Sequence, residues 1–92
     1  DLTNVNLSGV DLRYTNFSGA KFKGADLRNV NLSRVNLSGT NFSGADLRYA
    51  DLYGADLSGA DLKDSILLNA NMSTAILCNT NTPWGIDNTG CE

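Results

Sequence analysis

The side chains of this sequence that could take part in acid–base or metal chemistry are mostly aspartates, because the chain contains no histidine. Histidine is the commonest general base and the commonest metal ligand in proteins, so carboxylates and two cysteines remain as candidates. Four aspartates follow one another at intervals of five residues: Asp46, Asp51, Asp56 and Asp61. Carboxylates bind calcium or share acid–base work only if they converge on one point. The element that repeats every five residues therefore decides what these side chains can do.

The period of five runs through most of the chain. A large apolar residue stands at the centre of each five-residue unit, and a small or β-branched residue stands two positions before it. The centres are Leu2, Leu7, Leu12, Phe17, Phe22, Leu27, Leu32, Leu37, Phe42, Leu47, Leu52, Leu57, Leu62, Leu67, Met72 and Leu77. On an α-helix, five residues advance by about 140° beyond a full turn, and in a flat strand an odd period alternates between faces. All centres can point inward only if the chain turns a corner in each unit, so that four corners close a coil and the coils stack as a solenoid.

Such a solenoid separates the aspartates. Around one coil they point in four directions, and only residues twenty apart, such as Asp26 and Asp46, come close together. Two carboxylates make a poor calcium site, and Cys78 has no general base beside it. We therefore predict no catalytic residue, no metal site, no cofactor and no enzymatic activity.

The stretch ADLRYADLYGADLSGADL, residues 45–62, repeats the pattern Ala-Asp-Leu-x-x. This pattern resembles that of the pentapeptide-repeat family, and the resemblance covers residues 1–81. It implies an all-β fold, a right-handed quadrilateral parallel β-helix of about four coils, followed by a C-terminal capping segment over residues 82–92. Lys21, Ile66 and Ile76 depart from the Asp/Asn position of the pattern, and Thr82 departs from its centre.

The tail after Leu77 contains the only proline, the only tryptophan and both cysteines. An open solenoid end needs a cover, and Trp84 and Ile86 are the expected capping residues. The apolar residues Ile66, Leu68 and Ile76 are expected to form the apolar surface against which this cap packs. The chain begins in repeat phase with no comparable cap, so we expect that an N-terminal piece is missing.

Cys78 and Cys91 bracket this tail. A disulfide between them would close a loop worth roughly 3 kcal/mol on the chain-entropy model, and two free thiols in a reducing cytosol are the alternative. Similar tails bracketed by cysteines occur in pentapeptide-repeat proteins of cyanobacteria and of the thylakoid lumen. That resemblance, together with the bridge, favours an oxidising compartment such as the thylakoid lumen or periplasm, with the cytoplasm left open.

Two outer faces could bind partners. One carries Arg13, Tyr14, Arg34 and Tyr53 and is the expected docking surface for an acidic or aromatic protein partner. The other, the serine–glycine face, is flat and uncharged, which suits either self-association or the simple need for small residues at tight corners. It consists of Ser18, Ser38, Ser58, Gly19, Gly39 and Gly59. The uncovered N-terminal coil is a second surface for self-association.

Charge and hydropathy limit the partners further. A formal net charge of −3 argues against binding nucleic acid through a basic patch, and no apolar run is long enough to span a membrane. We therefore expect a non-enzymatic structural or protein-interaction module. The resemblance offers an alternative, a DNA mimic that binds DNA gyrase and gives quinolone resistance. Against it stand faces of mixed sign and a length of four coils, about half of a ~34 Å turn of B-DNA.

Overall fold

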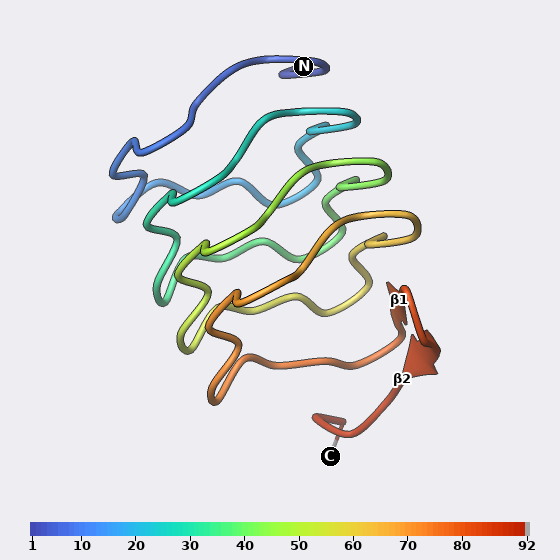
Figure 1. The fold of residues 1–92 in the computed structure, drawn as a ribbon. Coiled ribbons are helices and arrows are strands. Elements are labelled where there is room, and N and C mark those ends of the chain that lie inside the picture. Colours follow the sequence, from blue (N-terminus) through green and yellow to red (C-terminus); the bar gives the residue numbers. More distant parts are fainter. Residues whose placement is uncertain (92) are drawn as a thin grey trace.

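The computed structural model describes residues 1–91 of the chain. The backbone winds into stacked coils, with the N-terminus at one end of the stack and the C-terminus near the other (Figure 1). No helix occurs among the described residues, and so none could cross a membrane.

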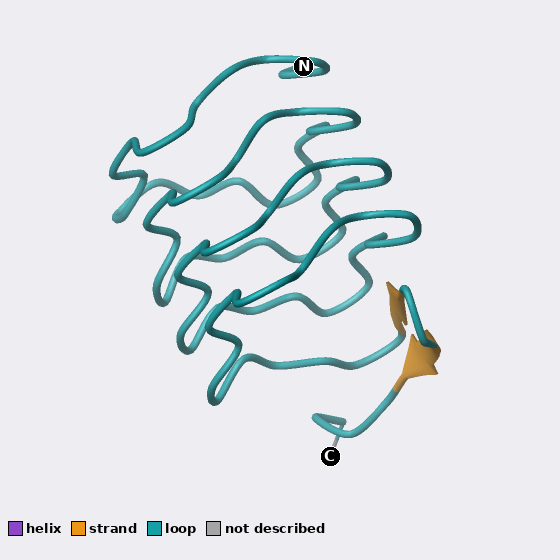
Figure 2. Ribbon diagram, in the orientation of Figure 1, coloured by secondary structure: helices purple, strands orange, loops and turns teal. Residues whose placement is uncertain are grey.

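Successive coils are joined by parallel bridges between residues twenty positions apart. One column runs through Asn6, Asp26, Asp46 and Ile66. An interval of twenty residues corresponds to four five-residue units per coil, as the sequence predicts. Each contact is a single bridge residue rather than a longer strand, and for this reason the coil wall is drawn as loop in Figure 2.

Local hydrogen bonds explain why the unit has five residues. In most units the carbonyl of the centre accepts the N–H three residues later, as Leu37 does from Thr40 at 3.2 Å. The Asp or Asn before the centre accepts the N–H two residues later, as Asn16 does from Ser18 at 2.9 Å. Asn and Asp side chains favour this kind of turn because they imitate a backbone acceptor.

Each corner also requires a left-handed backbone conformation. The residue two positions after the centre has a positive φ in every unit, from 51° at Asn79 to 76° at Gly9. A positive φ at this position is typical of a type II turn, which glycine and asparagine adopt most easily.

The centres fill the interior. Leu27, Leu37 and Leu47 have no exposed surface, and the rings of Phe22 and Phe42 stack with their centroids 5.2 Å apart, as the twenty-residue spacing predicts. The centres of the first coil are only partly buried, because this coil has a neighbouring coil on one side alone. The same is true of Leu67, Met72 and Leu77 in the last coil, whereas Leu62 is fully buried.

The chain ends in a short antiparallel hairpin of β1 (Thr80–Thr82) and β2 (Gly85–Asp87). Strand β1 continues the solenoid, since Asn81 bridges to Asp61, and β2 lies along its outer edge. The described part of the tail then returns to the segment that leads into β1, where the Gly90 N–H donates to the Leu77 carbonyl at 2.8 Å (Figure 1).

The hairpin does not place Trp84 and Ile86 as the sequence analysis expected. Their side chains are 62% and 64% exposed, so neither covers the core. The reason is register: Ile86 lies opposite Asn81, which belongs to the outward-facing Asp/Asn column, and cross-strand partners share a face. Trp84 sits in the hairpin turn, where its indole N–H donates to Asp87.

The apolar surface that the cap was expected to cover is also exposed. Ile66, Leu68 and Ile76 remain exposed. The tail approaches the coil at Ile76 and Leu77, where Gly90 lies, and this contact leaves Ile76 41% exposed. Thr80 and Thr82 are the residues that the hairpin buries. Their hydroxyls donate to the Leu57 and Gly85 carbonyls, respectively, so the burial leaves no unsatisfied side-chain donor.

Candidate functional site

The two cysteines are joined in a disulfide. The Cα atoms of Cys78 and Cys91 are 4.9 Å apart, and the bond ties the end of the tail to the last coil. Cys78 occupies the column of Ser18, Ser38 and Ser58, so the disulfide closes the C-terminal end of the serine–glycine face.

The regularly spaced aspartates serve the turns. Asp51, Asp56 and Asp61 each accept a backbone N–H two residues later, at 3.0 Å in all three cases. Among residues 1–91 no three His, Cys, Asp or Glu side chains are grouped as a metal site would require. The carboxylates therefore have a structural task at the corners.

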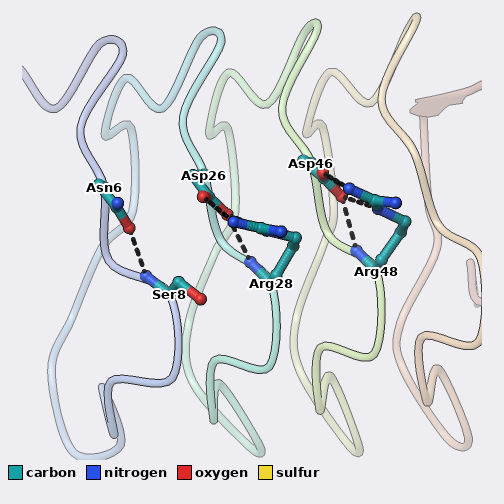
Figure 3. Close-up of polar contacts among 6 residues, drawn as sticks. All are labelled: Asn6, Ser8, Asp26, Arg28, Asp46 and Arg48. Atoms are coloured by element: carbon teal, nitrogen blue, oxygen red, sulfur yellow. Dashed lines mark hydrogen bonds and ion pairs between the residues drawn. The ribbon is translucent and has the colours of Figure 1, made fainter.

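One column of aspartates is paired with arginines, as Figure 3 shows. Asp26 accepts from Arg28, and Asp46 from Arg48, each at 2.7 Å, while Asn6 at the head of the column only caps Ser8. The hydrogen bonds from the arginine side chains are the main reason why the pKa values of both aspartates are lowered. The arginine side chains are exposed, so screening by solvent keeps the contribution of each pair to stability small.

The four residues expected to form a docking face do come together. They line one surface hollow of about 630 Å³, here called the Tyr14 groove. Its lining is Arg13, Tyr14, Thr15, Asn16, Ser33, Arg34, Val35, Asn36, Asp51, Tyr53 and Asn71. These residues belong to four stacked layers, so the groove runs along the stacking direction.

Each arginine of the groove lies over a tyrosine ring. The guanidinium carbon of Arg13 is 5.5 Å from the ring centre of Tyr14, and that of Arg34 is 5.6 Å from the ring centre of Tyr53. These distances are within the range of a cation–π interaction. Tyr14 is 95% exposed, so its ring is presented to the solvent.

The two arginines differ in their acidic partners. Arg13 is paired with Asp11 at 2.8 Å, and hydrogen bonding between them lowers the pKa of Asp11 and raises that of Arg13. Arg34 forms no ion pair within residues 1–91. Its stem crosses Gly54, where an added Cβ would lie 3.2 Å from the Arg34 Cγ. The glycine thus leaves room for Arg34 to reach Tyr53.

The hydrogen-bond ladder between coils is interrupted at this groove. By the spacing that the other coil contacts follow, the Tyr14 N–H would donate to Ser33, the Asn36 N–H to Thr15, and the Thr15 N–H to Leu12. None of these three backbone bonds is present within residues 1–91. The bonds on either side are intact, from Leu12 N–H to Asn31 and from Phe17 N–H to Asn36. Thr15 is exposed, although its position in the repeat is an inward one.

Left-handed backbone conformations at bulky residues accompany this interruption. Tyr14 has φ 68° and Arg34 has φ 61°, a region that costs an ordinary side chain roughly 1–2 kcal/mol. This strain was not among the features expected from the sequence. The signal was present, since Tyr14 and Arg34 stand at the same place in the repeat as Gly19 and Gly39.

Comparisons with known proteins agree with the geometry of the coils. The sequence pattern described as "Pentapeptide repeats" matches residues 1–29, 25–64 and 55–81, in 8 copies. The chain belongs to the pentapeptide-repeat family, whose members fold as right-handed β-helix solenoids. No curated protein matches the chain.

Two solved structures illustrate the likeness. HetL from the cyanobacterium Nostoc sp. strain PCC 7120, described as involved in heterocyst differentiation regulation, is 35% identical over 92% of this chain and 41% of its own, with a TM-score of 0.53. QnrB1, a plasmid-mediated fluoroquinolone resistance protein, is 20% identical over 98% of this chain and 58% of its own, with a TM-score of 0.63. The likeness to QnrB1 shows the fold alone. This chain spans about half the length of these structures.

Proposed function

We propose that the protein is a non-enzymatic protein-interaction module, a rod of about four coils over residues 1–81 whose docking surface is the Tyr14 groove. The observation that supports this function is the hollow of about 630 Å³ that gathers Arg13, Tyr14, Arg34 and Tyr53 from three layers of the solenoid. Tyrosine and arginine are enriched among the residues that dominate binding energy at protein interfaces. The hollow combines an exposed aromatic ring, that of Tyr14, with the two cationic side chains.

The groove is built to recognise shape as well as charge. Its two arginines and Asp51, with the paired Asp11 beside them, nearly balance in charge, so bulk attraction alone would not select a partner. The tyrosines are held by their arginine neighbours at 5.5 and 5.6 Å, which reduces the entropy lost when a partner is bound. A protein surface that offers an acidic or aromatic side chain meets both requirements.

The test is affinity capture from an extract of the source organism with three immobilised proteins. We expect the wild type to capture a specific partner and the double variant Tyr14→Ser, Tyr53→Ser to lose it. Tyr49→Ser is the matched control, because Tyr49 is also an exposed tyrosine with a positive φ but lies on another face. Equal capture by the double variant, or loss on substitution of the serine–glycine face instead, would show that the docking surface is elsewhere.

Gyrase binding by DNA mimicry is the alternative, and the fold shared with QnrB1 is what favours it. Length does not decide against it, since the chain extends 33 Å along its long axis, tail included, close to the ~34 Å of one B-DNA turn. The charge of the surface argues against mimicry, because Arg28 and Arg48 offset Asp26 and Asp46 where a DNA mimic needs a continuous negative stripe. We expect no inhibition of gyrase supercoiling at sub-micromolar protein, and inhibition there would favour mimicry over docking at the groove.

The disulfide supports a location in an oxidising compartment, such as the thylakoid lumen or the periplasm. Disulfides persist in such compartments and are rare in the cytosol. In this proposal residues 82–92, of which Glu92 lies outside the described residues, are the C-terminal capping segment. Its contact with the last coil is at Leu77, where the Gly90 N–H is bonded, and the Cys78–Cys91 bond holds it there.

A further inference from the structure

The interruption of the ladder at the Tyr14 groove is confined to one place. The other three corners of the first two coils keep every bond of the repeating pattern: Asn31 N–H donates to Val10 at 3.1 Å, and Asn41 N–H to Ala20 at 3.0 Å. Asn36 stands midway between these two residues in the repeat, and its N–H has no partner within residues 1–91. A general loosening of the first coil would affect all corners alike, so the cause is local.

The interruption leaves both kinds of backbone group beside the groove. The N–H groups of Tyr14, Thr15 and Asn36 are donors without partners among residues 1–91, and the carbonyls of Thr15 and Ser33 are acceptors in the same situation. The hollow therefore contains three free backbone donors and two free backbone acceptors. An extended peptide presents both N–H donors and carbonyl acceptors along its main chain and could bond to both kinds of group.

Arg34 adds a charge to this set. It lies in the same hollow, is fixed over Tyr53 and across Gly54, and forms no ion pair within residues 1–91. A guanidinium held in this way is suited to bind a carboxylate through two parallel hydrogen bonds. Asp51 also lines the groove and would repel an acid placed beside it, so the carboxylate belongs at Arg34 and not further along.

We infer that the Tyr14 groove binds a short extended peptide segment that carries an aspartate or glutamate. The main chain of the peptide bonds to the free backbone groups of Tyr14, Ser33 and Asn36, and its carboxylate pairs with Arg34. Three layer spacings give the groove a length of about 14 Å, which accommodates about four extended residues. The inference rests on the proposed function, because it specifies what part of a protein partner the groove recognises.

The first measurement concerns the protein without a partner. Amide hydrogen exchange, followed by NMR on the uniformly labelled chain, should show Asn36 exchanging at least about tenfold faster than Asn31 and Asn41, its equivalents at intact corners. Equal protection of all three amides would mean that the ladder is closed in solution and would overturn the inference.

The second measurement identifies the ligand chemistry with a displayed library of random peptides of about twelve residues. Peptides enriched on the wild type should share an acidic residue, and binding should fall at least about tenfold in Arg34→Gln and in peptides N-methylated next to that residue. Lys63→Gln, which removes one positive charge outside the groove, should bind normally. Enrichment without an acidic residue, insensitivity to Arg34→Gln or N-methylation, or no enrichment at all would refute the inference.

These results separate the two proposals. If Tyr14→Ser, Tyr53→Ser abolishes capture of a natural partner but the peptide experiment fails, the groove is the docking surface and recognises a folded surface instead of a segment. If capture is unaffected, the proposed function fails first.

Discussion

The Tyr14 groove and the serine–glycine face are neighbouring sides of one solenoid, built from the same five-residue unit, and they differ in what stands at the left-handed corner position. On the serine–glycine face this position holds Gly19, Gly39 and Gly59. The N–H of each of these glycines donates to a carbonyl of the next coil at 2.8 Å. In the groove it holds Tyr14 and Arg34, and the bond from Tyr14 is missing. The bond from Arg34 is intact at 2.7 Å, and so is the bond from Tyr49 on another face at 3.1 Å, although both residues are bulky and have a positive φ. The comparison therefore indicates that a bulky corner residue is compatible with backbone pairing, and that the interruption at Tyr14 is specific to that corner.

The largest test of this comparison is in the core beneath the two corners. Leu37 lies under the serine–glycine face and is fully buried, whereas Leu12 lies under the interrupted corner in the first coil, which has a neighbouring coil on one side alone, and is only partly buried. We expect Leu37→Ala to lower the free energy of unfolding by about 3 kcal/mol and Leu12→Ala by clearly less, since less apolar surface and a smaller cavity are involved. Urea denaturation measures both. Equal losses would mean that Leu12 is packed as well as Leu37 despite its place in the end coil.

A smaller effect is expected from exchanging the corner residues. Tyr14→Gly should raise the free energy of unfolding by about 1 kcal/mol because it relieves a positive φ, and Tyr14 is so exposed that little packing is lost. Gly39→Tyr should lower it by a similar amount, although a Cβ there would meet no atom closer than 3.9 Å. Gly39→Asn is the control and should be nearly neutral, since asparagine adopts this conformation readily. A destabilised Tyr14→Gly would show that the tyrosine ring, and not the backbone, determines this corner.

The smallest effect concerns pH. The pKa of Asp11 is lowered mainly by its side-chain hydrogen bond from Arg13, so the stabilisation from this pair is complete above the ordinary aspartate pKa and is lost as pH falls through the lowered one. In an NMR titration we expect the Arg13 Nε signal to shift in that acidic window, and to stay constant in Asp11→Asn. The Ser18 amide, capped by the non-titrating Asn16, should not follow it. An Arg13 signal that remains unchanged in the wild type would contradict the pairing.

The sequence was sufficient to predict the architecture because one physical requirement repeats sixteen times. Large residues every fifth position can be buried together only by a chain that turns a corner in each unit, and the burial of Leu27, Leu47 and Phe42 follows that rule. Arg13, Tyr14, Arg34 and Tyr53, which line the Tyr14 groove, could be grouped for the same reason, since residues twenty apart stack.

Two features depended on information that the period does not contain. The orientation of Ile86 is set by the register of the β1–β2 hairpin, which pairs it with Asn81, and the irregular sequence of residues 82–92 admits several registers. The missing bonds at Tyr14 and Asn36 do not follow from residue type alone, because Arg34 and Tyr49 have the same left-handed conformation as Tyr14 and keep their bonds to the next coil. Residues other than glycine and asparagine at the left-handed corner position identify Tyr14 as an unusual corner, but they do not reveal that its backbone bonds are missing.

The twenty-residue register of the bridges has a consequence for how such a chain can change in length. An insertion of five residues would satisfy every turn and every core contact nearby, yet it would rotate all later side chains by a quarter of the circumference, carrying Tyr53 to a neighbouring side and dismantling the groove. An insertion of twenty residues would lengthen the rod by one coil and leave the side chains of each face in alignment. Variation in multiples of four units is therefore the kind that this architecture can accept without losing its surfaces.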